Sequence, residues 1–163
     1  MNKIEKMASS PLKMKLFLLR QLPMAFLAGL KIVEFNKNSV KVSVPFKFLN
    51  KNPFRSVYFA VLSMAAELSS GVIALAAVSD SSVPVSMLVL KMRAEFLKKA
   101  KSKIVFTCND GEKIRETVKK SVETGEGQTI EVHSSGSDTS GDIVAEFIFE
   151  WTFKPKVKKQ VPE

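Results

Sequence analysis

The chain has 163 residues, of which 45% are hydrophobic and 25% are charged, and its formal net charge is +9. This composition excludes a disordered chain, a collagen-like repeat and a disulfide scaffold, because a chain of this length can bury a core as one domain. The positive charge attracts polyanions such as nucleic acid, an anionic membrane surface or a phosphate-bearing small molecule. Much of the excess lies near the chain ends, where charge is usually solvated, so a specific nucleic-acid role is not favoured.

The sequence holds one cysteine, Cys108, and one histidine, His133. A single cysteine cannot form an internal disulfide, and these two side chains alone cannot build a four-ligand structural zinc site. We therefore expect no cofactor and no metal. Cys108 ends a predicted strand and is expected to be a small buried residue, and His133 is expected to face solvent.

Residues 9–22 place Leu12, Leu16 and Leu19 at helical spacing, and Pro11 suits a helix start. Pro23 ends this helix, and a short helical segment follows up to Gly29. The apolar runs here are too short for a membrane span and lack a clear cleavage site. The sequence therefore predicts a cytoplasmic protein without membrane insertion.

Two strand patterns follow at 30–35 and 40–46, and the polar turn sequence between them predicts a β-hairpin. Residues 57–78 then contain a single charge, Glu67, among apolar and small side chains. A helix that is apolar all round is a buried helix. Ser56 is a candidate N-cap, and Gly71 could bend the later part of the helix.

The remaining residues predict four strands and one short helix. Residues 85–99 alternate strictly, which predicts a long half-buried strand with Leu88, Leu90, Met92, Ala94 and Phe96 on one face. Further strands are predicted at 101–108, 126–134 and 142–154, with a polar helix at 111–121 and a turn at 135–141. The last strand places an apolar row on its inner face, formed by Ile143, Ala145, Phe147, Phe149, Trp151 and Phe153.

This order of elements predicts an α+β fold in which a curved antiparallel sheet wraps around one long central helix. The expected organisation is an N-terminal helical segment at 1–29, the sheet-and-helix domain at 30–154 and a basic tail at 155–163. An apolar helix needs apolar surface on most sides, and the inner faces of the strands provide it.

Several sequence stretches resemble those of one superfamily. The stretch from Asn52 to Ala60 (NPFRSVYFA), with Ala65-Ala66-Glu67-Leu68 after it, resembles the central-helix start of hotdog-fold acyl-CoA thioesterases of the phenylacetyl-CoA thioesterase type. It is still more similar to a branch known only as a domain of unknown function. The FLKKA stretch at 96–100, Gly125 and the GDIVA stretch at 141–145 fit the same branch. The resemblance covers roughly residues 30–154 and implies the hotdog fold, with sites at a subunit interface.

The resemblance implies roles for a few residues. In the thioesterases a His-Gly-Gly begins the helix nine residues before an acidic residue, and here Tyr58, Phe59 and Ala60 occupy that start while Glu67 matches the acid. Glu67 would be the general base or nucleophile. The amide of Phe59 or Ala60 would polarise the thioester carbonyl. Tyr58 could donate a hydrogen bond to that carbonyl, or simply be a core tyrosine.

Glu67 also has a structural interpretation, because a mid-helix carboxylate among apolar residues is costly unless it is paired or protonated. Lys91 or Arg93 could pair with it in the chain, and Lys91 could also do so across a dimer seam. The candidate substrate-binding residues could equally fix the loop or belong to plain surface. They are Asn52, Arg55, Ser56, Lys91, Lys98 and Lys99.

Three functions remain open from the sequence. The first is an acyl-CoA thioesterase with Glu67 as its base. The second is a non-catalytic acyl or acyl-CoA binding protein, which the replacement at Tyr58-Phe59-Ala60 favours. The third is a basic scaffold or nucleic-acid binder, which only the net charge supports. The first two imply a small-molecule acyl ligand and a homodimer or a dimer of dimers.

Overall fold

The structure is a computed structural model that describes residues 3–8 and 10–156. Most of the predicted basic tail therefore lies outside the described residues. The helices are α1 (Lys3–Ala8), α2 (Pro11–Gln21), α3 (Pro23–Ala28), a 3₁₀ turn η1 (Phe48–Asn50), α4 (Phe59–Ser79) and α5 (Gly111–Thr124). The strands are β1 (Lys31–Phe35), β2 (Val40–Val44), β3 (Val85–Phe96), β4 (Ile104–Cys108), β5 (Gln128–Ser137) and β6 (Ile143–Pro155).

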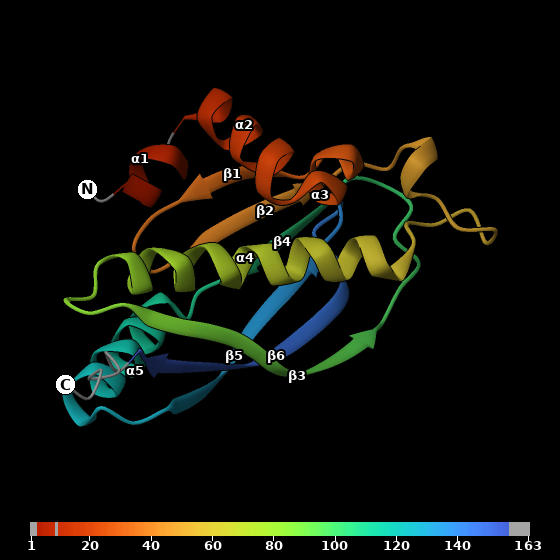
Figure 1. The fold of residues 1–163 in the computed structure, drawn as a ribbon. Coiled ribbons are helices and arrows are strands. Elements are labelled where there is room, and N and C mark those ends of the chain that lie inside the picture. Colours follow the sequence, from red (N-terminus) through yellow and green to blue (C-terminus); the bar gives the residue numbers. More distant parts are fainter. Residues whose placement is uncertain (1–2, 9, 157–163) are drawn as a thin grey trace.

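The six strands form one antiparallel sheet in the order β1-β2-β4-β5-β6-β3. Figure 1 shows the sheet curving around α4, which crosses its concave face. This is the predicted α+β architecture, the hotdog fold. The inner row of β6 forms much of the core, because Ala145, Phe147, Phe149, Trp151 and Phe153 are all buried. Ile143, which we predicted to face inward, is instead exposed at the start of the strand.

Small residues let α4 lie close against the sheet. Ala65, Ala66 and Ala74 have no exposed surface, and two buried serines join the helix to the strands. The hydroxyls of Ser69 and Ser134 are 2.7 Å apart, and the indole N–H of Trp151 donates to Ser70 Oγ at 3.1 Å. α4 is long and apolar enough to cross a membrane, yet most of it is buried inside the fold, so it is the core helix.

Strand β3 departs from the sequence prediction. A bulge between Val89 and Lys91 shifts its register against β6, so the strict alternation does not give one continuous inner face. Met87 and Val89 pack against the core before the bulge and Ala94 packs after it. The expectation of a single half-buried row is therefore wrong. Four members of that row are largely exposed at this open sheet edge: Leu88, Leu90, Met92 and Phe96.

The N-terminal helices pack at the other end of the molecule. α2 contacts β1 and α3 contacts α4, and buried Met14, Leu18, Ala25 and Ala28 join the common core. Helix α5 buries Ile114 and Val118, as its pattern predicts, and it continues to Thr124. The turn predicted at 135–141 is shorter, because β5 continues to Ser137.

Candidate functional site

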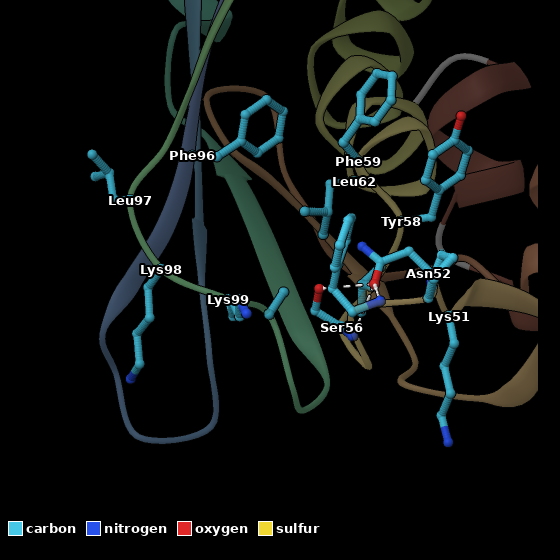
Figure 2. A pocket seen from close by; sticks show the side chains of 14 residues that line it. Lys51, Asn52, Ser56, Tyr58, Phe59, Leu62, Phe96, Leu97, Lys98 and Lys99 are labelled. Carbon is cyan, nitrogen blue, oxygen red and sulfur yellow. Dashed lines mark hydrogen bonds between the residues drawn. The ribbon is translucent and has the colours of Figure 1, made fainter.

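A cleft of about 780 Å³ opens at the amino end of α4. One wall comes from the loop at 51–58 and the first turn of the helix, and the other comes from the end of β3 and the segment that follows it. Figure 2 shows these two walls facing each other. The cleft thus brings together the two stretches, 52–60 and 96–100, that the sequence resemblance singled out.

Asn52 organises the loop in front of the helix. Its Oδ1 accepts hydrogen bonds from the backbone amides of Phe54 at 3.0 Å and Ser56 at 3.1 Å, and from the Ser56 hydroxyl at 3.2 Å. Arg55 takes a left-handed backbone with a φ of 58°, which is uncommon for a residue other than glycine. Asn52 and Ser56 therefore fix the loop, and the Arg55 side chain lies exposed on it without lining the cleft.

Helix α4 starts without a side-chain cap. Tyr58 is the N-cap residue with an extended backbone, so the prediction that Ser56 caps the helix is wrong, and Ser56 is instead buried beneath Asn52. The Tyr58 amide donates to Asn50 O at 2.7 Å. Within the described part of the chain, no group accepts a hydrogen bond from the amides of Phe59 and Ala60. Two free N–H groups at the positive end of a long helix are suited to hold a developing negative charge.

The cleft has an apolar end and a basic end. Phe59 meets Phe96 edge-on with ring centroids 6.2 Å apart, and Leu62 lies beside them. Figure 2 shows Lys51, Lys98 and Lys99 at the opposite end and the Tyr58 hydroxyl directed away from the Leu97 wall. A ligand with an apolar chain and an anionic headgroup matches this division.

Lys98 is already engaged by acidic partners. Its ammonium lies 2.9 Å from Asp138 Oδ2 and 2.5 Å from Asp142 Oδ2, in the turn between β5 and β6. The hydrogen bonds that Lys98 donates to these carboxylates hold its pKa above its ordinary range. Lys99 is exposed and has no acidic partner among the described residues. Lys99 is therefore the stronger candidate for an anionic group of a ligand.

Glu67 lies in the middle of α4, half-buried against the sheet. A Cβ placed on Gly71, one turn further on, would lie 2.8 Å from Glu67 Oε1 and 3.5 Å from the Trp151 ring. The carboxylate therefore occupies the space that the missing Gly71 side chain leaves beside Trp151. Burial raises the pKa of Glu67, and no described side chain donates to it or forms an ion pair with it. Gly71 thus makes room for the acid, and the kink considered from the sequence is not needed to explain it.

The two basic residues proposed as in-chain partners of Glu67 have other partners. Lys91 Nζ lies 3.2 Å from Glu150 Oε2 and Arg93 Nη2 lies 2.8 Å from Glu131 Oε1, both on the outer face of the sheet. Lys91 is also highly exposed. The interpretation of Glu67 as an ion-pair partner of Lys91 or Arg93 in its own chain is therefore wrong.

The structure does not bring Glu67 to the amino end of α4. Glu67 is eight residues beyond Phe59 along a continuous helix, which corresponds to about 12 Å at 1.5 Å per residue. Glu67 does not line the cleft, and neither does Ala60 or Lys91. One chain therefore carries two parts of the predicted site that cannot contact the same carbonyl group.

The other chemically active side chains are removed from both parts. Cys108 is fully buried, and desolvation raises the pKa of its thiol to about 11, so it is not a nucleophile at neutral pH. His133 is exposed on β5, as predicted. In residues 3–8 and 10–156, no group of three His, Cys, Asp or Glu side chains is placed to hold a metal ion.

Sequence reasoning missed Lys51 and Leu62 as cleft residues and Gly71 as the neighbour of Glu67. The Gly71 signal was present, since a glycine four residues after a lone acid shares its helix face. No sequence pattern pointed to Lys51, because its position is set by the folded loop. There its Nζ lies 4.8 Å from the centre of the Phe46 ring.

Comparison with known proteins gives one family and a group of related folds. Residues 13–153 match the family described as "Domain of unknown function (DUF4442)". No curated protein matches the chain at a significant level.

Several solved structures of proteins named as thioesterases share the fold of this chain. A protein of unknown function from Pseudomonas aeruginosa, named a probable thioesterase, is 23% identical with a TM-score of 0.76, covering 90% of this chain and 97% of that one. A thioesterase from Haemophilus influenzae is 14% identical with a TM-score of 0.63, covering 90% and 92%. A thioesterase from Staphylococcus aureus, solved as a mutant, is 14% identical with a TM-score of 0.59, covering 82% and 99%. At these identities the likeness shows the hotdog fold alone.

Proposed function

We propose that this chain, which belongs to the DUF4442 family, is an acyl-thioester hydrolase that uses Glu67 as its general base. One observation carries the proposal: a carboxylate lies in the core helix beside Gly71 and Trp151 with no described partner to balance it. A group kept in such a place despite its cost is a candidate for function.

Hydrolysis moves one proton to Glu67 and back, and it places a negative charge on the carbonyl oxygen for part of the reaction. The Glu67 carboxylate accepts a proton from water, and the hydroxide formed adds to the thioester carbonyl. The carbonyl oxygen becomes an oxyanion, and the C–S bond then breaks to give a carboxylic acid and a thiolate. The thiolate takes the proton back from Glu67 and leaves as a thiol. In the alternative route a Glu67 oxygen attacks the carbonyl and the C–S bond breaks, which releases the thiolate and leaves a mixed anhydride. Water then hydrolyses the anhydride to the carboxylic acid, restores the Glu67 carboxylate and supplies the proton that converts the thiolate to the thiol.

The free amides of Phe59 and Ala60 are suited to hold the oxyanion. They lie at the positive end of a 21-residue helix and need no reorganisation, because the loop behind them is fixed by Asn52. The acyl chain would lie near Phe59 and Phe96, and a coenzyme A phosphate would contact Lys99 at the basic end of the cleft.

A second copy of the chain completes this site. The roughly 12 Å between Glu67 and the amino end of α4 requires the base and the oxyanion donors to come from different protomers. Strand β3 is suited to join them, because it is an open 12-residue edge with exposed Leu88, Leu90 and Met92. Its bulge follows Val89, which pairs with Trp151, and the Trp151 ring lies 3.5 Å from the position of a Cβ on Gly71. We expect a homodimer, or a dimer of dimers, in the cytoplasm.

The second candidate function is acyl-thioester binding without hydrolysis. Phe59 favours this function. Its side chain is half-exposed and occupies the position of a glycine in the thioesterases that the sequence resembles, beside the amides that a carbonyl would approach. A bulky side chain at that point could leave room for a bound ligand but not for a tetrahedral intermediate.

Thiol release from a panel of short, long and aromatic acyl-CoA thioesters distinguishes the two functions. The wild type should release thiol from at least one class, and Glu67→Gln should lower the rate by about 100-fold or more, since a general base contributes 10²–10⁴-fold. Glu146→Gln, an exposed acid on β6, is the matched control and should keep full activity. Binding without turnover in the wild type would favour the non-catalytic protein.

A further inference from the structure

Helix α2 carries two apolar rows, of which only one is used by the fold. Met14 and Leu18 are buried against β1 and the core. A second row at helical spacing faces outward, with Leu12 78% exposed, Leu16 47% and Leu19 48%. It continues through exposed Leu22, Met24 and Leu27. A helix on the surface of a globular protein needs one apolar stripe, and a second, contiguous one indicates an interaction surface.

Cationic side chains accompany this outer row. Lys13, Lys15 and Arg20 are exposed on α2, and residues 10–29 contain no acidic residue. Lys6 of α1 joins Lys13 and Arg20 in lining a groove of about 620 Å³, which Leu16 and Phe17 also line. None of these cations forms an ion pair with a described acidic side chain, whereas three acids on the sheet are each paired with a basic side chain: Glu34, Glu131 and Glu150.

We propose that the outer face of α2 and α3 docks on an anionic lipid bilayer. An interfacial helix buries its apolar row at the level of the headgroups while lysines and arginines meet the lipid phosphates. The outer row and the four cations, none of which has an acidic partner among the described residues, provide both contributions; Lys15 Nζ lies 5.9 Å from the centre of the Phe26 ring. The helix would lie on the surface of the bilayer without spanning it, because α2 is only 11 residues long.

The position of this face leaves it free when the protein dimerises. α2 lies over β1, at the opposite end of the sheet from the open edge β3, as Figure 1 shows. The face is also tied to the cleft wall: Lys47 donates to Leu27 O at 2.7 Å, and buried Asn50 donates to Ala28 O at 2.9 Å. Both residues come just before the loop that lines the cleft. Membrane docking does not require the proposed hydrolase activity, and the two can be tested separately.

Vesicle co-sedimentation of the full chain tests the docking. The probes are vesicles of phosphatidylcholine alone and of phosphatidylcholine with phosphatidylglycerol. We expect binding to the anionic vesicles that weakens with salt, and weak binding to the neutral ones. Because each cation near an anionic surface is worth about fivefold in affinity, the triple variant Lys13→Gln/Lys15→Gln/Arg20→Gln should lose about 100-fold.

Two further variants separate a bilayer from other partners. Leu12→Ser/Leu16→Ser/Leu19→Ser keeps every charge and should lose about tenfold or more, whereas a polyanion such as nucleic acid would not need these leucines. Lys101→Gln/Lys103→Gln/Lys120→Gln removes the same charge from exposed sites elsewhere and should keep most of the binding. All substituted positions are exposed, so the thermal unfolding midpoint should not change.

Three results would overturn the proposal. The first is no binding to anionic vesicles at low salt. The second is an equal loss of vesicle binding in the two triple variants that remove positive charge, which would mean that only net charge matters. The third is a smaller solution mass for the leucine variant, which would show that a second copy of the chain covers this face.

Discussion

The amino end and the middle of α4 lie on one continuous helix and differ in almost every physical respect. The amino end is exposed, holds the unpaired amides of Phe59 and Ala60, and opens onto a cleft. The middle is packed against the sheet and holds one unpaired carboxylate, Glu67, with a raised pKa. One region offers hydrogen-bond donors and the other an acceptor, about 12 Å apart. The comparison teaches that each chain carries two half-sites, and that assembly must join them.

The largest effect is expected at the amino end. Phe59→Pro removes one amide donor, and the helix should tolerate it because proline is favoured at the first helical position and Tyr58 already has an extended backbone. Loss of an oxyanion donor should lower kcat by about 100-fold or more. Phe59→Ala keeps the amide and is the matched control. Equal losses in both variants would assign the effect to the ring and remove the amide from the mechanism.

The next effect is expected in the middle of the helix. Gly71→Ala places a methyl group 2.8 Å from the Glu67 carboxylate, which must move. We expect kcat to fall by about 10-fold to 100-fold with little change in KM, because a small displacement of a catalytic group is costly. Gly127→Ala, whose added methyl group has nothing closer than 4.0 Å, is the control. An unchanged kcat in Gly71→Ala would separate Glu67 from catalysis.

A smaller effect is expected at the basic end of the cleft. Lys99→Gln should raise KM for coenzyme A thioesters by about twofold to fivefold, the range of an exposed charge contact, and reduce the salt dependence of KM. Lys101→Gln, two residues further along the chain, should leave both unchanged. If the two variants behave alike, the cleft does not hold the phosphate groups.

The smallest effect concerns pH and the Glu67 region alone. Because burial raises the pKa of Glu67, the acid limb of the kcat/KM profile should lie at a higher pH than the pKa of an ordinary glutamate. The folded state also favours the protonated form, so the contribution of Glu67 to stability is full below the pKa of an ordinary glutamate and is lost as pH rises through the folded pKa. Glu67→Gln should therefore match the Tm of the wild type at low pH and exceed it by a few degrees above the folded pKa, since 1 kcal/mol corresponds to about 2–4 °C.

The sequence predicted the helix and the sheet because their patterns are local. The apolar run of α4 and the alternating row that ends at Trp151 and Phe153 are properties of consecutive residues, and both were confirmed apart from Ile143 at the start of the row. The faces of β3 were not predictable in this way, since one inserted residue in a bulge changes the inward side of everything beyond it.

The candidate site was predicted only in part for a related reason. The pattern located Glu67 and the helix start, because both belong to one linear motif. It could not give the partners of Lys91 and Lys98, which come from residues of β6 and of the turn before it. Nor could it show that Ser56 bonds to Asn52, since the loop closes through a backbone conformation at Arg55 that no residue type dictates.

Complementation between two inactive variants tests the two-half-site account most directly. Glu67→Gln and Phe59→Pro chains, carrying different tags, are co-expressed, and the mixed dimer is purified and assayed for thioester hydrolysis. The account predicts that each single variant is nearly inactive while the mixed dimer recovers activity, because one of its two sites combines an intact Glu67 with an intact helix start. A mixed dimer that forms but stays inactive would contradict the account, as would a fully active wild-type monomer.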